Sequence, residues 1–290
     1  MPDFFKYHGL GNDYLVLEPA RFSAPPSPQA VRLICDRNRG VGSDGVVWGP
    51  LEPPPGNGGH AARIFNPDGS EAEKSGNGLR IFARFLWDRH YATVSPFAIH
   101  VPGGTVGARI LDSDGRRIAM EMGRASFQSR DIPMAGKPRE ALRETLEIAG
   151  RALVINGATV GNPHCVVLVD APTPALAREL GPAIETHPLF PNRTNVQFMR
   201  RLNEHAIQIE IWERGAGYTL ASGTSSCAAA AVACRLGLCG SPVKVHMPGG
   251  TLDVRIGSGY ELEMEGPVAA VAQGDFAPDL LLEAGLKRRE

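Results

Sequence analysis

Short stretches in which apolar and polar residues alternate recur along the chain and predict β-strands. In the first half they lie at 4–7, 14–18, 61–65, 98–101, 106–111 and 117–121, and a further apolar stretch at 46–48 also predicts a strand. In the second half they lie at 165–169, 195–199, 206–212, 243–246, 252–256 and 261–264. Four longer stretches, at 28–38, 78–91, 173–180 and 224–238, predict helices. Many short strands with a few helices indicate an α+β fold.

The same landmarks occur twice, in the same order. Ile64 lies eleven residues before Ser75, and Ile211 lies eleven residues before Ser222. Each serine is followed by a glycine at the start of a predicted helix, and a PGGT segment follows at 102–105 and again at 248–251. Such a repeat indicates a duplication. We therefore expect two pseudo-symmetric domains, each a mixed or antiparallel, barrel-like sheet around a central helix, with a ligand cleft between them.

Composition narrows the class of protein. The chain has 290 residues with 30 Lys and Arg against 31 Asp and Glu, and this balance argues against nucleic acid as a partner. The longest uncharged run, between Arg214 and Arg235, is rich in Gly, Ser, Thr and Ala and is too polar for a membrane span. The N-terminus has no apolar signal-peptide core. Five cysteines without a C-x-x-C pair indicate neither a disulfide framework nor a metal site. We expect a soluble, cytoplasmic protein without membrane partners.

The two Ser-Gly elements carry the first chemical hint. Ser75 and Ser222 stand where helices are expected to start, and unpaired N–H groups at a helix start favour an anion. Two such helix starts facing one cleft would bind a carboxylate. The segment GVGSDG at 40–45 matches a dinucleotide-binding pattern, but a helix precedes it and a strand follows, the reverse of the required order. We interpret this segment as a structural turn.

Other candidate residues are ambiguous when taken singly. His8, Asn12, Asn162 and His164 lie in predicted turns, where such side chains either stabilise the turn or bind a ligand. Glu213 and Arg214, taken alone, fit a solvated ion pair. The chain has only five lysines, none in a recognisable pyridoxal context, so a Schiff-base cofactor has few anchors.

Taken together, these segments resemble the diaminopimelate epimerase family, the cofactor-independent amino-acid epimerases of bacterial lysine and cell-wall synthesis. The resemblance covers almost the whole chain. The segments that carry it are KYHGLGND at 6–13, CDR at 35–37, GVGSDG at 40–45, RIFNPDGSE at 63–71, GNGLR at 76–80, GNPH at 161–164, NV at 195–196, ERGAG at 213–217 and PGG at 248–250.

The resemblance implies a fold, an assembly and a reaction. It implies domains at 1–122 and 123–267, with residues 268–290 returning to the first domain, and a homodimer. It also implies stereoinversion of LL-diaminopimelate to meso-diaminopimelate by two bases on opposite faces of the α-carbon. The family's two catalytic cysteines fall at the positions of Ser75 and Ser222, and His164 and Glu213 match the groups that accompany them.

The resemblance also implies how an amino-acid substrate is held. Side chains for the distal amino-carboxylate end, and backbone donors for the reacting carboxylate, are carried over by position. An Arg with several amides suits a zwitterion, since its forked donors match a carboxylate and amide carbonyls accept from an ammonium. The side chains are Asn12, Asn66, Asn162, Asn195, Glu213 and Arg214, and the backbone donors are Gly76, Asn77, Gly223 and Thr224.

The two serines are the main departure from the family. A thiol has a reference pKa of about 8.5, which a helix start lowers further, whereas an alcohol is a far weaker acid and a poorer acid/base catalyst. Three interpretations fit: an epimerase whose two cysteines were replaced, a natural paralogue that racemises or eliminates from another amino acid with help from His164 or Glu213, or a ligand-binding pseudoenzyme. Lys74 and Tyr218, which differ from a typical member, favour the natural paralogue over the replaced form.

Overall fold

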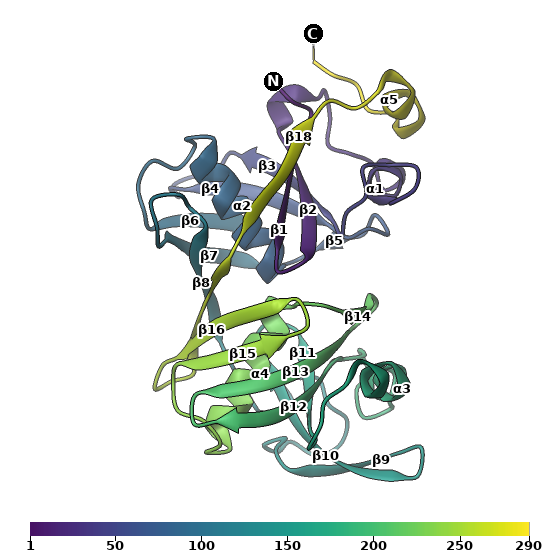
Figure 1. The fold of residues 1–290 in the computed structure, drawn as a ribbon, viewed down its shortest axis with the longest axis vertical. Helices are drawn as coiled ribbons and strands as arrows, with labels where there is room; N and C mark the ends of the chain where they lie inside the picture. The colour runs from purple at the N-terminus through teal and green to yellow at the C-terminus, as the bar shows by residue number, and fades with distance from the viewer. Residues whose placement is uncertain (290) are drawn as a thin grey trace. The chain divides into compact units, whose positions relative to one another are not determined.

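The chain folds into two compact units. The computed structural model describes residues 1–289, in which 1–120 and 266–289 form unit 1 and Glu121–Glu265 forms unit 2 (Figure 1). The boundaries expected from sequence, after residues 122 and 267, lie two residues later in the chain at each place.

Unit 1 combines a mixed sheet with three α-helices and one short 3-10 helix. Strand β8 continues across the boundary into unit 2. The elements are β1 Phe4–Gly9, β2 Asn12–Leu17, η1 Pro19–Arg21, α1 Pro28–Cys35, β3 Val46–Leu51, β4 His60–Phe65, β5 Glu71–Ala72, α2 Gly76–Asp88, β6 Phe97–Val101, β7 Gly104–Ile110, β8 Arg117–Arg124, β18 Ala269–Gly274 and α5 Pro278–Ala284.

Unit 2 is built in the same way, from strands and two α-helices. The elements are β9 Glu144–Ile148, β10 Arg151–Thr159, β11 Pro163–Leu168, α3 Pro174–Glu185, β12 Asn195–Asn203, β13 Ala206–Glu213, β14 Gly217–Thr219, α4 Gly223–Arg235, β15 Val243–Met247, β16 Gly250–Ile256 and β17 Glu261–Pro267.

The sheet topology shows the predicted duplication directly. In unit 1 the paired strands run in the order β18, β1, β2, β3, β4, β6, β7, β8, and β2–β3 and β4–β6 are parallel while the other pairs are antiparallel. In unit 2 the order is β9, β10, β11, β12, β13, β15, β16, β17, with β11–β12 and β13–β15 parallel. Both units therefore share one succession of strand directions, and the α+β duplicated fold is confirmed.

The strand at one end of the sheet comes from a different part of the sequence in each unit. Strand β9 precedes its partner β10 directly in the chain, whereas β18, which pairs with β1, comes from the far end of the sequence (Figure 1). The carboxylate of Asp3, fully buried, accepts from the backbone N–H of Phe276 and from the guanidinium of Arg288. These contacts attach the C-terminal segment to the first strand.

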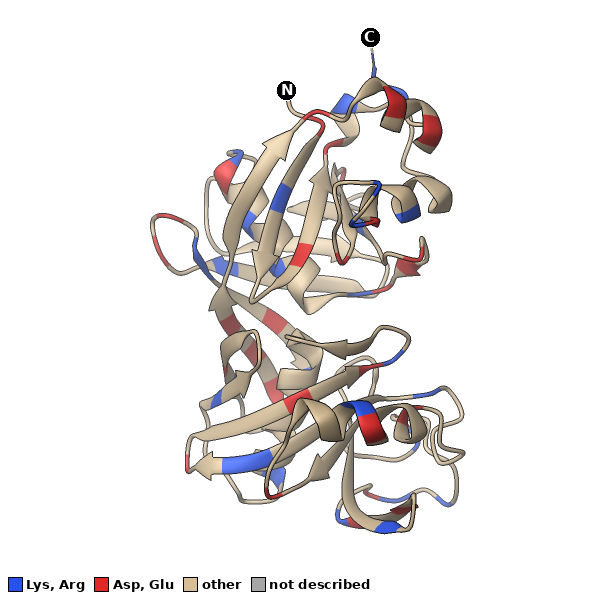
Figure 2. Ribbon diagram, turned by 45° about the vertical axis from the view of Figure 1, so that its right-hand side comes forward, with Lys and Arg blue, Asp and Glu red and all other residues tan. Residues whose placement is uncertain are grey.

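One buried helix lies at the centre of each unit. Helix α2 packs against β1, β2, β3 and β7, and α4 packs against β10 to β13, β15 and β16. The segment 227–231 of α4 is one cysteine followed by four alanines, all fully buried, because small side chains let strands approach the helix closely. Charged residues of both signs are interspersed in each unit (Figure 2). Among residues 1–289, no helix is long and apolar enough to cross a bilayer.

The four predicted helices exist, but the C-terminal end of each differs from expectation. Helix α2 ends at Asp88 rather than at residue 91, and α4 ends at Arg235 rather than at residue 238. Helix α1 stops at Cys35 rather than at residue 38, because Asp36 is extended (ψ 123°) and its carboxylate accepts from the N–H groups of Asn38 and Arg39. Helix α3 continues through Pro182 to Glu185 instead of ending at residue 180. Gly181 lets the continued helix pack closely against β13, since a Cβ there would lie 2.6 Å from the Trp212 ring.

Candidate active site

The start of α2 is the candidate segment of unit 1. Ser75 is the N-cap residue, and its extended backbone (φ −134°) lets Oγ accept from the N–H of Gly78 at 3.1 Å. The half-buried Ser75 side chain also shares a hydrogen bond of 3.1 Å with the phenol of Tyr14. Gly76 and Asn77 occupy the first two helical positions, where N–H groups lack an intrahelical acceptor. This helix start can therefore hold an anion next to a hydroxyl.

The start of α4 is the equivalent candidate segment of unit 2 and is built in the same way. Ser222 caps the helix with φ −146°, and its Oγ accepts from the N–H of Ser225 at 3.4 Å. Gly223 and Thr224 take the first two helical positions. The Ser226 hydroxyl donates to the carbonyl of Ser222 at 2.8 Å and so fixes the backbone of the cap.

Around Ser75, a chain of polar side chains orients Asn12. The Asn77 amide donates to Asn12 Oδ1 at 3.0 Å, and Asn12 Nδ2 donates to Asp44 Oδ2 at 3.0 Å. The fully buried Arg80 donates to Asn77 Oδ1 at 3.0 Å. Both atoms of the Asn12 amide group are thus held in place within unit 1.

The carboxylates beside Asn12 belong to an ion-pair cluster. Arg37 Nη2 lies 2.8 Å from both Asp13 and Asp44, and Lys6 Nζ lies 2.9 Å from Asp13. Burial alone would raise the pKa of Asp13, but Arg37 and Lys6 outweigh it and hold that pKa below its usual value. Burial raises the pKa of Asp44. The cluster anchors the loop between α1 and β3, which confirms that the segment 40–45 is a structural turn between a helix and a strand.

His164 lies at the centre of the polar network in unit 2. Gln197 Nε2 contacts His164 Nδ1 at 3.1 Å and Ser225 Oγ at 2.9 Å, and His164 Nε2 lies 2.8 Å from Asn162 Oδ1. Because the Gln197 amide nitrogen can only donate, Nδ1 accepts and Nε2 carries the proton. Complete burial lowers the pKa of His164 to about 3. The imidazole is therefore neutral near pH 7, with both nitrogens hydrogen-bonded inside the unit.

The remaining predicted binding residues of unit 2 surround one turn. Asn195 Nδ2 donates to the carbonyl of Pro163 at 2.9 Å, and Asn195 Oδ1 accepts from the N–H of Arg214 at 3.0 Å. The exposed Arg214 guanidinium donates to the carbonyl of Asn192. Glu213, half-buried, is the last residue of β13 and pairs with Gly217 of β14. The turn thus carries an acidic and a basic side chain on consecutive residues.

Comparison with known proteins identifies the family. The sequence profile described as "Diaminopimelate epimerase" matches residues 4–128 and 157–271. Diaminopimelate epimerase 2 from Nostoc sp. is 51% identical over 277 residues, which is 96% of both chains. A diaminopimelate epimerase from Pelotomaculum thermopropionicum is 38% identical over 94% of this chain and 98% of its own. The chain belongs to the diaminopimelate epimerase family.

Family membership makes the chain an isomerase of the amino-acid epimerase type. Solved structures agree on the fold. A hydroxyproline epimerase from Agrobacterium vitis superposes with a TM-score of 0.72 at 16% identity, over 97% of this chain and 94% of that one. A probable proline racemase from Agrobacterium radiobacter gives 0.71 at 15% identity, over 96% and 94%.

Within each unit of this diaminopimelate epimerase family member, some of the predicted site residues share a hydrogen-bond network. In unit 1 Asn12 and Asn77 are bonded to each other, while Ser75 bonds separately to Tyr14. In unit 2 Asn162 and His164 are linked through Gln197 to Ser225, in the helix that Ser222 caps. Asn66 follows β4, and its amide donates to Ser70 Oγ at 3.0 Å.

Sequence reasoning missed three residues of the site. Tyr14 and Gln197 lie in the hydrogen-bond networks described above. The buried Glu185 accepts from the Trp212 ring at 2.7 Å and from the N–H of Gly215 at 2.8 Å, and so fixes the turn that carries Arg214. Strand alternation could have found Tyr14, because it lies two residues after Asn12 and so points to the same face of β2.

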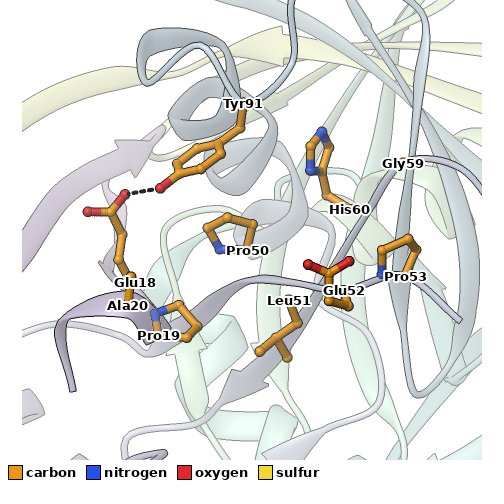
Figure 3. Close-up of a pocket in the computed structure, with 10 residues that line it drawn as sticks. All are labelled: Glu18, Pro19, Ala20, Pro50, Leu51, Glu52, Pro53, Gly59, His60 and Tyr91. Carbon is orange, nitrogen blue, oxygen red and sulfur yellow. Dashed lines mark hydrogen bonds between the residues drawn. The ribbon is translucent and has the colours of Figure 1, made fainter. Parts of the chain in front are cut away.

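A separate pocket lies at the other end of unit 1. Asn12 and Ser75 lie at the starts of β2 and α2, whereas the pocket residues Glu18 and Tyr91 follow the ends of these elements. The cavity, of about 390 Å³, is lined by prolines, His60 and Glu52, and the Tyr91 hydroxyl donates to Glu18 at 2.8 Å (Figure 3). None of the residues predicted for the active site lines this pocket.

Proposed function

We propose that the chain inverts diaminopimelate at one α-carbon, from the LL to the meso form, without a cofactor and with Ser75 and Ser222 as its two acid/base groups. The observation that carries the proposal is the duplicated cap. In each unit a serine begins the central helix, and its Oγ accepts from the N–H three residues on. The chain's relatives named diaminopimelate epimerase support the substrate.

The proposed substrate explains the polar residues around each helix start. The N–H groups of Gly76, Asn77, Gly223 and Thr224 would stabilise the reacting carboxylate and the charge that spreads onto it when the α-proton leaves. The six side chains carried over by position would bind the distal ammonium and carboxylate. Of these, the Arg214 guanidinium supplies the positive charge.

Hydroxyl groups in place of thiols set the expected rate. A hydroxyl is a weak acid and its alkoxide is scarce at pH 7, so exchange is expected to be slow compared with a thiol enzyme. In this proposal the serines carry the acid/base role, and His164 and Glu213 are accompanying groups. His164 in particular is neutral, with its proton bonded to Asn162 Oδ1.

The test is α-proton exchange measured by proton NMR in deuterium oxide, with LL-diaminopimelate and the unmodified chain. We expect slow loss of the α-proton signal and appearance of the meso form. Ser75→Ala and Ser222→Ala should each abolish the inversion, whereas Ser113→Ala, at an exposed turn, should not change it. If the signal persists for days while calorimetry shows binding, the chain is a ligand-binding protein and the proposal fails.

The proposal extends to assembly and location. We propose a homodimer in the cytoplasm, on the resemblance to the family. Analytical ultracentrifugation of the purified chain gives the molecular mass in solution, and cell fractionation gives the compartment. A sedimenting mass near 31 kDa would contradict the dimer.

A further inference from the structure

The hydroxyl of Ser75 has a titratable neighbour. The Tyr14 phenol lies 3.1 Å from Ser75 Oγ, and either hydroxyl can be the donor. Because Ser75 Oγ already accepts from the N–H of Gly78, its own proton is directed elsewhere. Tyr14 is buried, so this bond forms with little competition from water.

The surrounding backbone is shaped around the phenol ring. A Cβ at Gly45 would lie only 2.4 Å from Tyr14 Cε1, and a Cβ at Gly78 would lie 3.3 Å from the same atom. The carbonyl of Gly45 accepts from the N–H of Leu15 at 3.1 Å, which holds the loop against β2. The ring is therefore confined to the position in which its oxygen meets Ser75.

The other unit places a different residue at the equivalent position. Leu15 pairs with Val46 in parallel strands of unit 1, and Cys165 pairs with Val196 in unit 2, so Tyr14 and His164 correspond. The two units differ in what these residues contact. The His164 ring bonds to Asn162 and Gln197, and Gln197 reaches Ser225, whereas Tyr14 bonds directly to the helix-start serine.

We propose that Tyr14 is the proton-relay partner of Ser75, so that the first unit exchanges protons with the substrate through a tyrosine–serine pair. The inference rests on the proposed function, in which Ser75 faces the substrate α-carbon. Tyr14 acts through Ser75 and is thus a positioning and relay residue.

Protons and electrons balance both when the pair removes the α-proton and when it delivers one. In removal, the Cα–H bond breaks and its proton goes to Ser75 Oγ, while the Ser75 hydroxyl proton passes to the Tyr14 phenolate. The electron pair left on Cα is delocalised into the carboxylate at the helix start. In delivery, Ser75 gives its proton to Cα and takes the Tyr14 proton. A phenol suits this exchange, because its ordinary pKa of about 10 lies far below that of an aliphatic alcohol.

A thiol placed at position 75 tests the pair without any substrate. In Ser75→Cys, the Tyr14 hydroxyl should donate to the thiolate and lower the thiol pKa. Adding Tyr14→Phe should raise that pKa by about one unit and slow iodoacetamide alkylation at pH 7 by roughly tenfold. Peptide mass spectrometry distinguishes this thiol from the five native cysteines, four of which are buried.

Two matched controls accompany this measurement. Tyr7→Phe removes another buried phenol of unit 1, one bonded to Asp88, and should leave the thiol pKa unchanged. Tyr14→Phe combined with Ser222→Cys should likewise leave the unit 2 thiol unchanged. An equal thiol pKa with and without Tyr14→Phe would overturn the relay, whether or not the chain acts on diaminopimelate.

Exchange kinetics give the second readout. Tyr14→Phe with Ser75 intact should lower kcat at least tenfold, leave KM within about twofold, and change the form of the pH–rate profile. A merely structural role would change KM or stability but not the form of the pH profile. An unchanged profile would contradict the relay. If the parent chain shows no exchange, the proposed function fails, and the thiol measurement alone decides the Tyr14–Ser75 pair.

Discussion

Arg288 and Asp3, from opposite ends of the chain, form an ion pair in which Nη2 lies 2.6 Å from Oδ2. Arg21 adds a second contact of 2.8 Å, and the Asp3 side chain is fully buried. Burial alone would raise the pKa of Asp3, but the two guanidinium groups outweigh it and lower that pKa below its usual value. Asp3 is therefore negatively charged in the folded chain at neutral pH.

Asp3→Asn should destabilise unit 1 by about 2–4 kcal/mol, because it leaves two arginines facing a neutral group. Since the folded pKa is depressed, the contribution of Asp3 is complete above the unfolded pKa of about 3.9 and is lost as pH falls through the folded value. Urea unfolding at pH 7 and pH 3 measures both effects. Asp275→Asn, at an exposed partner of Arg21, should change the free energy of unfolding by less than about 0.5 kcal/mol. Equal losses in the two variants would contradict the assignment.

His164 should make the folded chain sensitive to acid. Its pKa is lowered to about 3 in the folded state from an ordinary value of 6.5, so below pH 6.5 the unfolded chain binds a proton that the folded chain does not. Stability should therefore fall with decreasing pH between these values, by about 1.4 kcal/mol per pH unit from this group. His164→Asn should reduce the slope of unfolding free energy against pH between 4 and 6. His205→Asn, which removes an exposed imidazole, serves as the control.

Ser75→Cys combined with Ser222→Cys should accelerate α-proton exchange on diaminopimelate by roughly a hundredfold or more, because thiol pKa values lie much closer to working pH. The exchange rate by NMR is the measurement. Ser113→Cys puts a thiol at an exposed turn away from both helix starts, and should not accelerate exchange. A double variant no faster than the parent would indicate a site adapted to another reaction.

Gly45→Ala should displace Tyr14 from Ser75. Its Cβ would lie 2.4 Å from the phenol ring and 2.7 Å from the carbonyl of Phe65, an overlap that costs about 1–3 kcal/mol. Gly58→Ala, where nothing lies within 4 Å, should cost almost nothing. Thermal unfolding compares the two variants. A Gly45→Ala protein as stable as the Gly58→Ala protein would contradict the close packing of Tyr14.

Much of the fold could be predicted from the sequence, because its signals are local. Ser27, Thr173 and the two site serines each cap a helix with a side-chain oxygen, and such residues before a periodic stretch predict helix starts. Helix α5 was missed because Ala277, at its N-cap, offers no such oxygen. Strands β9 and β10 were also missed. These two strands pair with each other as a hairpin. The alternation of apolar and polar residues did not predict either strand.

For the site, the sequence could predict where its residues lie along the chain but not which side chains they contact. The repeat located Ser75 and Ser222, because equal spacing from Ile64 and Ile211 is visible in the sequence. The partners of these residues depend on strand register. Gln197 meets His164 across 33 residues because β11 and β12 pair in parallel, and Tyr14 meets Ser75 across 61 residues because α2 packs against β2. Contacts of that kind become visible only when the sheet is assembled.

The position of β18 reverses the order in which the two units can be completed during synthesis. All of Glu121–Glu265 leaves the ribosome before β18 does, so unit 2 has every one of its strands while unit 1, begun first, still lacks the neighbour of β1. Until then the outer edge of β1 is open to other strands. A nascent chain stalled before residue 269 would therefore carry a finished second unit and an unfinished first one.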